Sequence, residues 1–158
     1  MRLGIAIALA AGCWLTTLTA QATESVRITL PAAVGFAVTN VGVSTTGAPN
    51  PTTASFAMLS VSGSKVLRIS VKADSNFVPP SGAAIPASNV SWATTGATNG
   101  IGTNGVLNTT AYGQVFVSAA GRKSGNVTVR WTLAAPATPL RAGLHSLTVR
   151  WKLESFAP

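Results

Sequence analysis

The chain has 158 residues and a formal net charge of +8, with 11 Lys and Arg against only 3 Asp and Glu, one His and one Cys. So few acids, with a single His, leave little material for acid–base or metal chemistry, and we predict a protein that is not an enzyme and holds no cofactor or metal. The basic residues are sparse and only Arg122 and Lys123 are adjacent, a pattern that does not favour nucleic-acid binding.

The first 22 residues have the three parts of a secretory signal peptide. Arg2 gives a basic tip, the run from Leu3 to Leu18 is apolar, and Ala20 and Ala22 stand three and one positions before a cleavage site. We therefore predict a signal-peptide helix over 1–22 that is removed, a mature chain without cysteine over 23–158, and a secreted, periplasmic or cell-surface location. The apolar run is too short for a comfortable membrane span, so no transmembrane segment is expected after processing.

A lipid anchor is the alternative for this segment. Cys13 follows Leu9-Ala10-Ala11-Gly12, which resembles a bacterial acylation site except that the Leu stands one position too far back. The apolar run also continues past Cys13, as though the segment had not ended there.

The mature sequence favours β-structure, because it is rich in Val, Thr, Ser and Gly and alternates apolar with polar residues. Three strands are predicted clearly, over Lys65–Ala73, Gly125–Leu133 and Leu144–Ser155. The residues that these strands should turn inward are Leu67, Ile69, Val71, Val127, Val129, Trp131, Leu133, Leu147, Val149, Trp151 and Leu153.

Four further segments are weaker strand candidates, and turn-forming stretches separate the strands. The candidates are Val26–Leu30, Phe36–Val43, Asn89–Ala93 and Gln114–Ser118. Pro- and Gly-rich stretches at 47–51, 78–82 and 135–139 should interrupt regular structure, and 94–110 should form either a loop or a short edge hairpin. We predict one all-β domain over 23–158, an Ig-like antiparallel β-sandwich of about seven to nine strands.

Two segments, Thr128–Leu133 and Thr148–Leu153, share five of six residues. We expect them to pair as antiparallel neighbours in one sheet. The register that separates their two arginines would set Val129 opposite Val149 and Trp131 opposite Leu147.

No residue constellation indicates catalysis. His145 falls on the inward side of the last predicted strand, and the nearest acid, Glu154, falls on its other side. Asp74 follows a strand and precedes Ser75-Asn76, as turn-forming Asp residues do. The glycine pattern at 100–105 superficially resembles a dinucleotide fingerprint, but no strand–helix context surrounds it.

Several aromatic residues could serve either the core or a sugar-stacking platform, and the apolar neighbours of the tryptophans favour the core. These residues are Trp92, Tyr112, Phe116, Trp131 and Trp151. Three glycosylation sequons, at Asn89, Asn108 and Asn126, are frequent by chance in a chain so rich in Ser and Thr.

The closing segment, Pro139-Leu140-Arg141-Ala142-Gly143-Leu144-His145-Ser146-Leu147-Thr148-Val149, resembles the last strand of bacterial secreted Ig-like sandwiches of the spore coat protein U and fimbrial-subunit type. The resemblance implies a sandwich fold and a structural role at a bacterial surface. The chain departs from that pattern because its mature part has no disulfide pair and its last residues, Ser155-Phe156-Ala157-Pro158, lack a penultimate aromatic.

Two functional hypotheses follow. The first is a structural or surface component that associates with itself or with other surface proteins by strand pairing, through the arm Glu24–Leu30, unless that arm is the first strand of its own sheet. The second is a module that binds glycans or acidic polysaccharide through a basic sheet face, whose candidate contacts are Arg68, Lys72, Arg130, Arg150 and Lys152.

Overall fold

The computed structural model describes residues 25–40, 42–60, 64–77, 84–135 and 142–158. The predicted signal peptide, its cleavage residues Ala20 and Ala22, and Cys13 lie outside these ranges. Within them, no helix has the length and apolar character needed to cross a membrane.

The described residues form eleven β-strands and one 3-10 turn. The strands are β1 (Ser25–Thr29), β2 (Ala33–Val38), β3 (Thr45–Ala48), β4 (Thr52–Ser60), β5 (Val66–Ala73), β6 (Val90–Thr98), β7 (Gly100–Gly102), β8 (Gly105–Val106), β9 (Gly113–Ser118), β10 (Ser124–Leu133) and β11 (Gly143–Phe156), and the turn is Ala87–Asn89. This confirms the predicted all-β class. There are more strands than the expected seven to nine because β3, β7 and β8 contain only two to four residues each.

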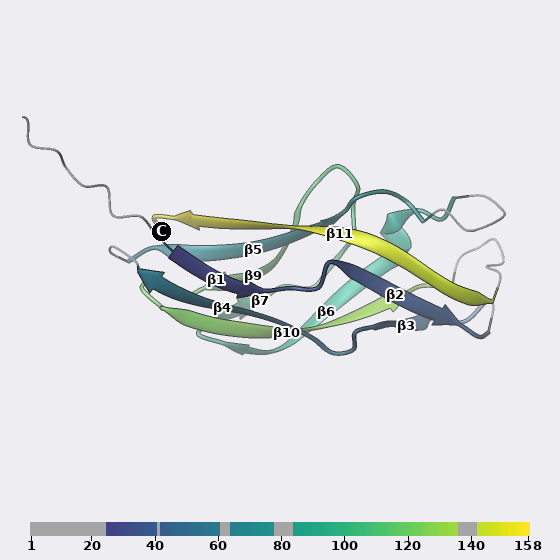
Figure 1. Cartoon of the computed structure of the whole chain (residues 1–158), viewed down its shortest axis with the longest axis horizontal. Coiled ribbons are helices and arrows are strands. Elements are labelled where there is room, and N and C mark those ends of the chain that lie inside the picture. Colours follow the sequence, from purple (N-terminus) through teal and green to yellow (C-terminus); the bar gives the residue numbers. More distant parts are fainter. Residues whose placement is uncertain (1–24, 41, 61–63, 78–83, 136–141) are drawn as a thin grey trace, which may run out of the picture.

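The strands are arranged as two antiparallel layers (Figure 1). Strands β1, β4, β10, β6 and β8 follow one another in the first layer, and β2, β11, β5, β9 and β7 in the second. Strand β3 pairs with both β10 and β2 and so links the layers along one side. On the other side the chain passes from β6 to β7 through Asn99, which has the positive φ (57°) that such a tight turn requires.

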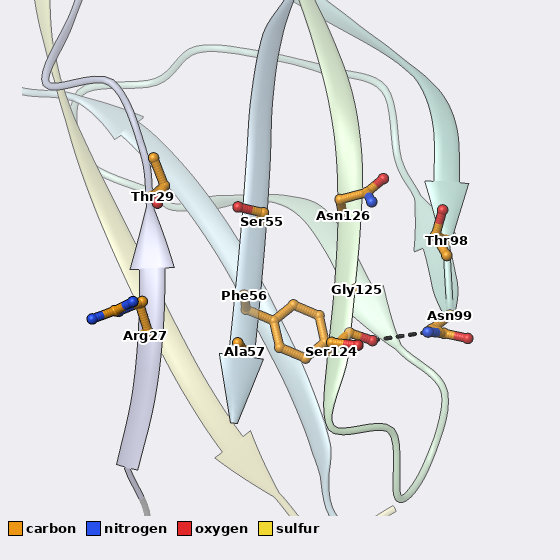
Figure 2. A pocket seen from close by; sticks show the side chains of 10 residues that line it. All are labelled: Arg27, Thr29, Ser55, Phe56, Ala57, Thr98, Asn99, Ser124, Gly125 and Asn126. Atoms are coloured by element: carbon orange, nitrogen blue, oxygen red, sulfur yellow. Dashed lines mark hydrogen bonds between the residues drawn. The ribbon is translucent and has the colours of Figure 1, made fainter. Parts of the chain in front are cut away.

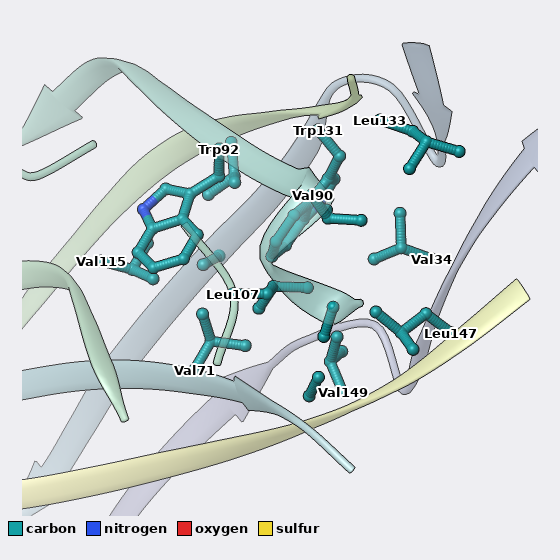
Figure 3. Close-up of a cluster of buried hydrophobic side chains, with 14 of the residues drawn as sticks. Val34, Val71, Val90, Trp92, Leu107, Val115, Trp131, Leu133, Leu147 and Val149 are labelled. Atoms are coloured by element: carbon teal, nitrogen blue, oxygen red, sulfur yellow. The ribbon is translucent and has the colours of Figure 1, made fainter. Parts of the chain in front are cut away.

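The core lies between the two layers. Trp131 of β10 meets Trp151 of β11 at a ring separation of 6.2 Å and Trp92 of β6 at 6.1 Å. Phe56 of β4 likewise meets Phe116 of β9 at 5.8 Å. Around these rings pack aliphatic side chains from both layers, among them Val34, Val71, Val115, Leu133 and Leu147 (Figure 3).

The three clearly predicted strands are present as β5, β10 and β11. All the inward positions predicted on β5 and β10 are buried, as are Leu147 and Val149 on β11. Two inward predictions hold only in part, because Trp151 is half-buried and Leu153 is 37% exposed. The weaker candidates correspond to β1, β2, β6 and β9, with β2 beginning three residues earlier than expected.

The predicted pairing of the two similar segments is wrong. β10 pairs with β3, β4 and β6, whereas β11 pairs with β2 and β5. The two strands belong to opposite layers, and the contact of Trp131 with Trp151 crosses the core. Both segments alternate apolar and polar residues in the same way, and this correctly predicted which side chains point into the core. The pattern does not say whether the two strands are neighbours in one layer or face each other from opposite layers.

The turn predictions need one correction, and the predicted stretches at 78–82 and 136–139 lie outside the described residues. Gly47 and Ala48 belong to β3, so the first Pro-rich stretch interrupts the strands only from Pro49 onward. Strand β6 continues to Thr98, and β7 and β8 follow, so of the two alternatives for the 94–110 segment the structure shows the one with short strands.

The N-terminal arm belongs to the protein's own sheet. β1 pairs antiparallel with β4, with Arg27 opposite Ala57 and Ile28 opposite Phe56. The chain then changes layers at Pro31, whose carbonyl accepts a hydrogen bond from the Trp151 indole at 2.7 Å. In this structure the arm is therefore not available to complete another molecule's sheet.

Candidate polyanion-binding face

Four of the five basic residues selected from the sequence lie on the outer side of the β5–β11 pair. The antiparallel register sets Lys72 directly opposite Arg150 and Arg68 opposite Glu154. Lys152 lies between those two pairs on β11. Because successive side chains on a strand alternate between its two faces, these cations all point away from the core. We call Arg68, Lys72, Arg150 and Lys152 the basic face.

Tyr112, immediately before β9, lies within this face. Tyr112 is 39% exposed. The Lys72 ammonium lies 5.3 Å from the ring centre and the Lys152 ammonium 5.9 Å. Cation–π contacts at exposed sites contribute about 0.5–1 kcal/mol each, enough to keep both ammonium groups near the ring. The basic face therefore has one exposed aromatic ring with two positive charges close to it.

Arg150 is engaged by an acid. Its Nε donates a hydrogen bond to Asp74 Oδ1 at the end of β5. That bond holds the pKa of Asp74 below its ordinary value, against the opposing effect of desolvation, and the charges of Arg150 and Lys72 also lower this pKa. Asp74 lies in the bend that follows β5, as its sequence neighbours indicated, and its carboxylate also accepts the hydrogen bond from Arg150 of the neighbouring strand.

Lys152 also has an acidic partner, since its ammonium lies 2.7 Å from Glu154 Oε1 two residues further along β11. This hydrogen bond lowers the pKa of Glu154, and the charge of Arg68 across the strand pair acts in the same direction. Both partners are substantially exposed, so the pair is screened by water and exchanges readily with other ions.

Arg68 is a half-buried member of the basic face. Its guanidinium lies over the Phe156 ring at 4.6 Å, and its Nε is buried without a hydrogen-bond partner among the described residues. The basic face as a whole has four cations against the two acids, which leaves a net excess of two positive charges.

Arg130 does not belong to this group. It is exposed on the outer side of β10, in the other layer, opposite Ala93 of β6. The sequence placed it with the others because β10 and β11 were expected to be neighbours.

The aromatic residues divide as the core interpretation predicted. Trp92, Trp131 and Phe116 are buried and Trp151 is half-buried, so these four form no exposed stacking platform. Tyr112 alone of the five is available at the surface. Its position near two lysines could not be predicted from the sequence, because Lys72 and Lys152 reach it from strands β5 and β11.

His145 and Glu154, the acid–base candidates considered from the sequence, lie on opposite sides of β11. His145 is buried on the inner side of β11, opposite Phe36, while Glu154 points outward near the other end of that strand. No group of three or more His, Cys, Asp and Glu residues capable of holding a metal occurs in the described ranges.

Comparison with known proteins adds no relative, since no family model, curated protein or solved structure matches the chain.

Proposed function

We propose that this protein is a non-catalytic, exported β-sandwich that serves as a surface or extracellular component and attaches to acidic polysaccharide through its basic face. The observation that carries the proposal is the placement of the exposed Tyr112 ring between the ammonium groups of Lys72 and Lys152.

This arrangement suits a ligand that combines sugar rings with negative charges. An aromatic ring offers an apolar surface that can contact a sugar ring, and an ammonium group close to that ring can pair with a carboxylate or sulfate of the sugar. Arg150 adds a planar donor next to Lys72, suited to carboxylate recognition.

The ion pairs on the face set the expected strength of binding. Asp74 and Glu154 neutralise part of the charge, and an incoming polyanion has to compete with them. We therefore expect moderate affinity that falls as salt rises, because exposed charges are screened over about 8–10 Å at physiological ionic strength.

Retention on immobilised dextran sulfate and polygalacturonate tests the proposal. The double variant K72Q/K152Q should elute at clearly lower salt than the unmodified protein. The matched control is R122Q/K123Q, which also removes two positive charges, but from the exposed turn before β10. It should elute nearly as the unmodified protein does. Equal losses in both variants would show attraction by net charge alone and would contradict a site at Tyr112.

A structural role through self-association is the second candidate. It is favoured by β1, which among the described strands pairs only with β4 and so leaves one edge unpaired. Sedimentation at increasing protein concentration should then show reversible oligomers. A strictly monomeric protein at every concentration would exclude this role.

A further inference from the structure

The outer side of the first layer carries Arg27 and Arg130, and between them lies a row of uncharged polar side chains. Thr29, Ser55, Asn126 and Thr98 stand next to one another on β1, β4, β10 and β6. We call these four residues the polar row. Figure 2 shows them side by side across four strands.

A shallow pocket of about 320 Å³ lies along this row. Arg27, Ala57, Ser124 and Asn99 line it on one side of the row, and Phe56 and Gly125 complete the lining. The Asn99 carboxamide donates a hydrogen bond to the Ser124 carbonyl at 3.0 Å, which fixes the end of the pocket near the β6–β7 turn. The small side chains of Ala57, Ser55 and Ser124 leave this part of the sheet hollowed.

The polar row has unused hydrogen-bonding capacity. Within the described part of the chain, the side chains of Thr29, Ser55, Asn126 and Thr98 make no hydrogen bond. Each hydroxyl can donate one bond and accept two, and the carboxamide can do both. Four adjacent strands thus hold a rigid set of donors and acceptors directed to one pocket.

The charge of the lining limits the class of ligand. Among the described residues, no carboxylate lines the pocket and Arg27 is its one cation. In Figure 2 the Arg27 side chain extends from β1 away from the polar row. A phosphate or sulfate would find no group of cations here, and an apolar molecule would bury hydroxyls without partners.

The volume of the pocket limits the size of the ligand. Ligand pockets generally begin near 300 Å³, so this one holds a single sugar ring rather than an oligosaccharide. We propose that the pocket binds one residue of a neutral glycan, recognised by its hydroxyls through the polar row. This site is independent of the basic face, because it lies on the other layer and uses no lysine.

Titration of the ¹⁵N-labelled protein with the methyl glycosides of glucose, galactose and N-acetylglucosamine tests the proposal. At least one should produce saturable amide shifts confined to the pocket lining, with millimolar affinity and no dependence on salt. A single lost hydrogen bond weakens binding about fivefold, so N126A and T98V should each raise the Kd by that factor.

The control is T132V, which removes an outward hydroxyl from the same strand, β10, outside the pocket and should bind as the unmodified protein does. T98V keeps the shape of an exposed side chain, so its effect does not depend on a variant that folds poorly. The absence of saturable shifts with about 100 mM of every glycoside would overturn the proposal. Unchanged affinity in N126A and T98V, or binding of glucuronate alone that is lost in R27Q, would overturn it as well.

Discussion

At the scale of single residues, two glycines make room for Trp92. A Cβ atom on Gly105 would lie 2.3 Å from Trp92 Cζ2, and one on Gly113 would lie 2.4 Å from Cη2. The indole also donates a hydrogen bond to the Thr103 carbonyl at 2.7 Å. The segment between β6 and β9 is therefore packed closely against Trp92, in addition to its own buried Leu107.

We expect G105A to destabilise the protein by about 1–3 kcal/mol, because overpacking forces side chains and backbone to shift. Urea denaturation measures the change as a lower midpoint at unchanged slope. Gly35 provides the matched control, since a Cβ there would meet its nearest neighbour only at 3.7 Å. If G105A and G35A were equally stable, the tight packing around Trp92 would be wrong.

Two exposed carboxylates make the stability depend on pH. The pKa of Asp74 is lowered from 3.8 by the hydrogen bond from Arg150, and that of Glu154 from 4.5 by the bond from Lys152. Groups whose pKa falls on folding contribute stability above their unfolded pKa and lose it as the pH falls through the folded value. This contribution should thus be complete above about pH 5 and decline through and below pH 4.

The double variant D74N/E154Q isolates this effect. Its urea midpoint should fall less between pH 6 and pH 3 than that of the unmodified protein. The same loss in both proteins would mean that the two ion pairs do not contribute.

At the scale of the elements, β3, β4 and β10 are joined by a buried polar contact. The Trp131 indole donates to the Thr52 hydroxyl at 3.2 Å, and that hydroxyl donates to the Pro49 carbonyl at 3.0 Å. Thr52 is only 4% exposed. The start of β4 is thereby fixed to the largest side chain of the core.

We expect T52V to destabilise the protein by about 1–3 kcal/mol, because it leaves the buried Trp131 N–H without its partner. T53V is the control, since Thr53 is exposed on the same strand and should change stability by less than about 0.5 kcal/mol. Chemical denaturation of the two variants compares them directly. Equal effects would argue against the Trp131–Thr52 bond.

Strands could be predicted where large apolar residues alternate with polar ones, as in β5, β10 and β11. β4 was missed because two of its buried positions are the small residues Thr52 and Ala54, which weaken the alternation. Strand partners could not be predicted. The two-residue period predicts which side chains point into the core. It does not predict the partners of β10 and β11, because these are the strands β2 to β6, which lie far away in the sequence.

At the scale of the whole molecule, the two layers have outer surfaces of different character. The second layer has the basic face with its exposed tyrosine, and the first layer has the uncharged polar row and its pocket. The sequence predicted four of the residues on the basic face from alternation alone. It could not predict their ion pairs, the place of Tyr112 or the pocket, because each of these joins strands distant in sequence.

We propose that acidic polysaccharide binds at the basic face. The most direct test of this claim is the footprint of a short oligogalacturonate on the amide spectrum of the ¹⁵N-labelled protein at low salt. We predict saturable shifts at Lys72, Tyr112, Arg150 and Lys152 that disappear at high salt. Shifts centred on Arg122 and Lys123 or on Arg130, or no saturable shift at low salt, would contradict the claim.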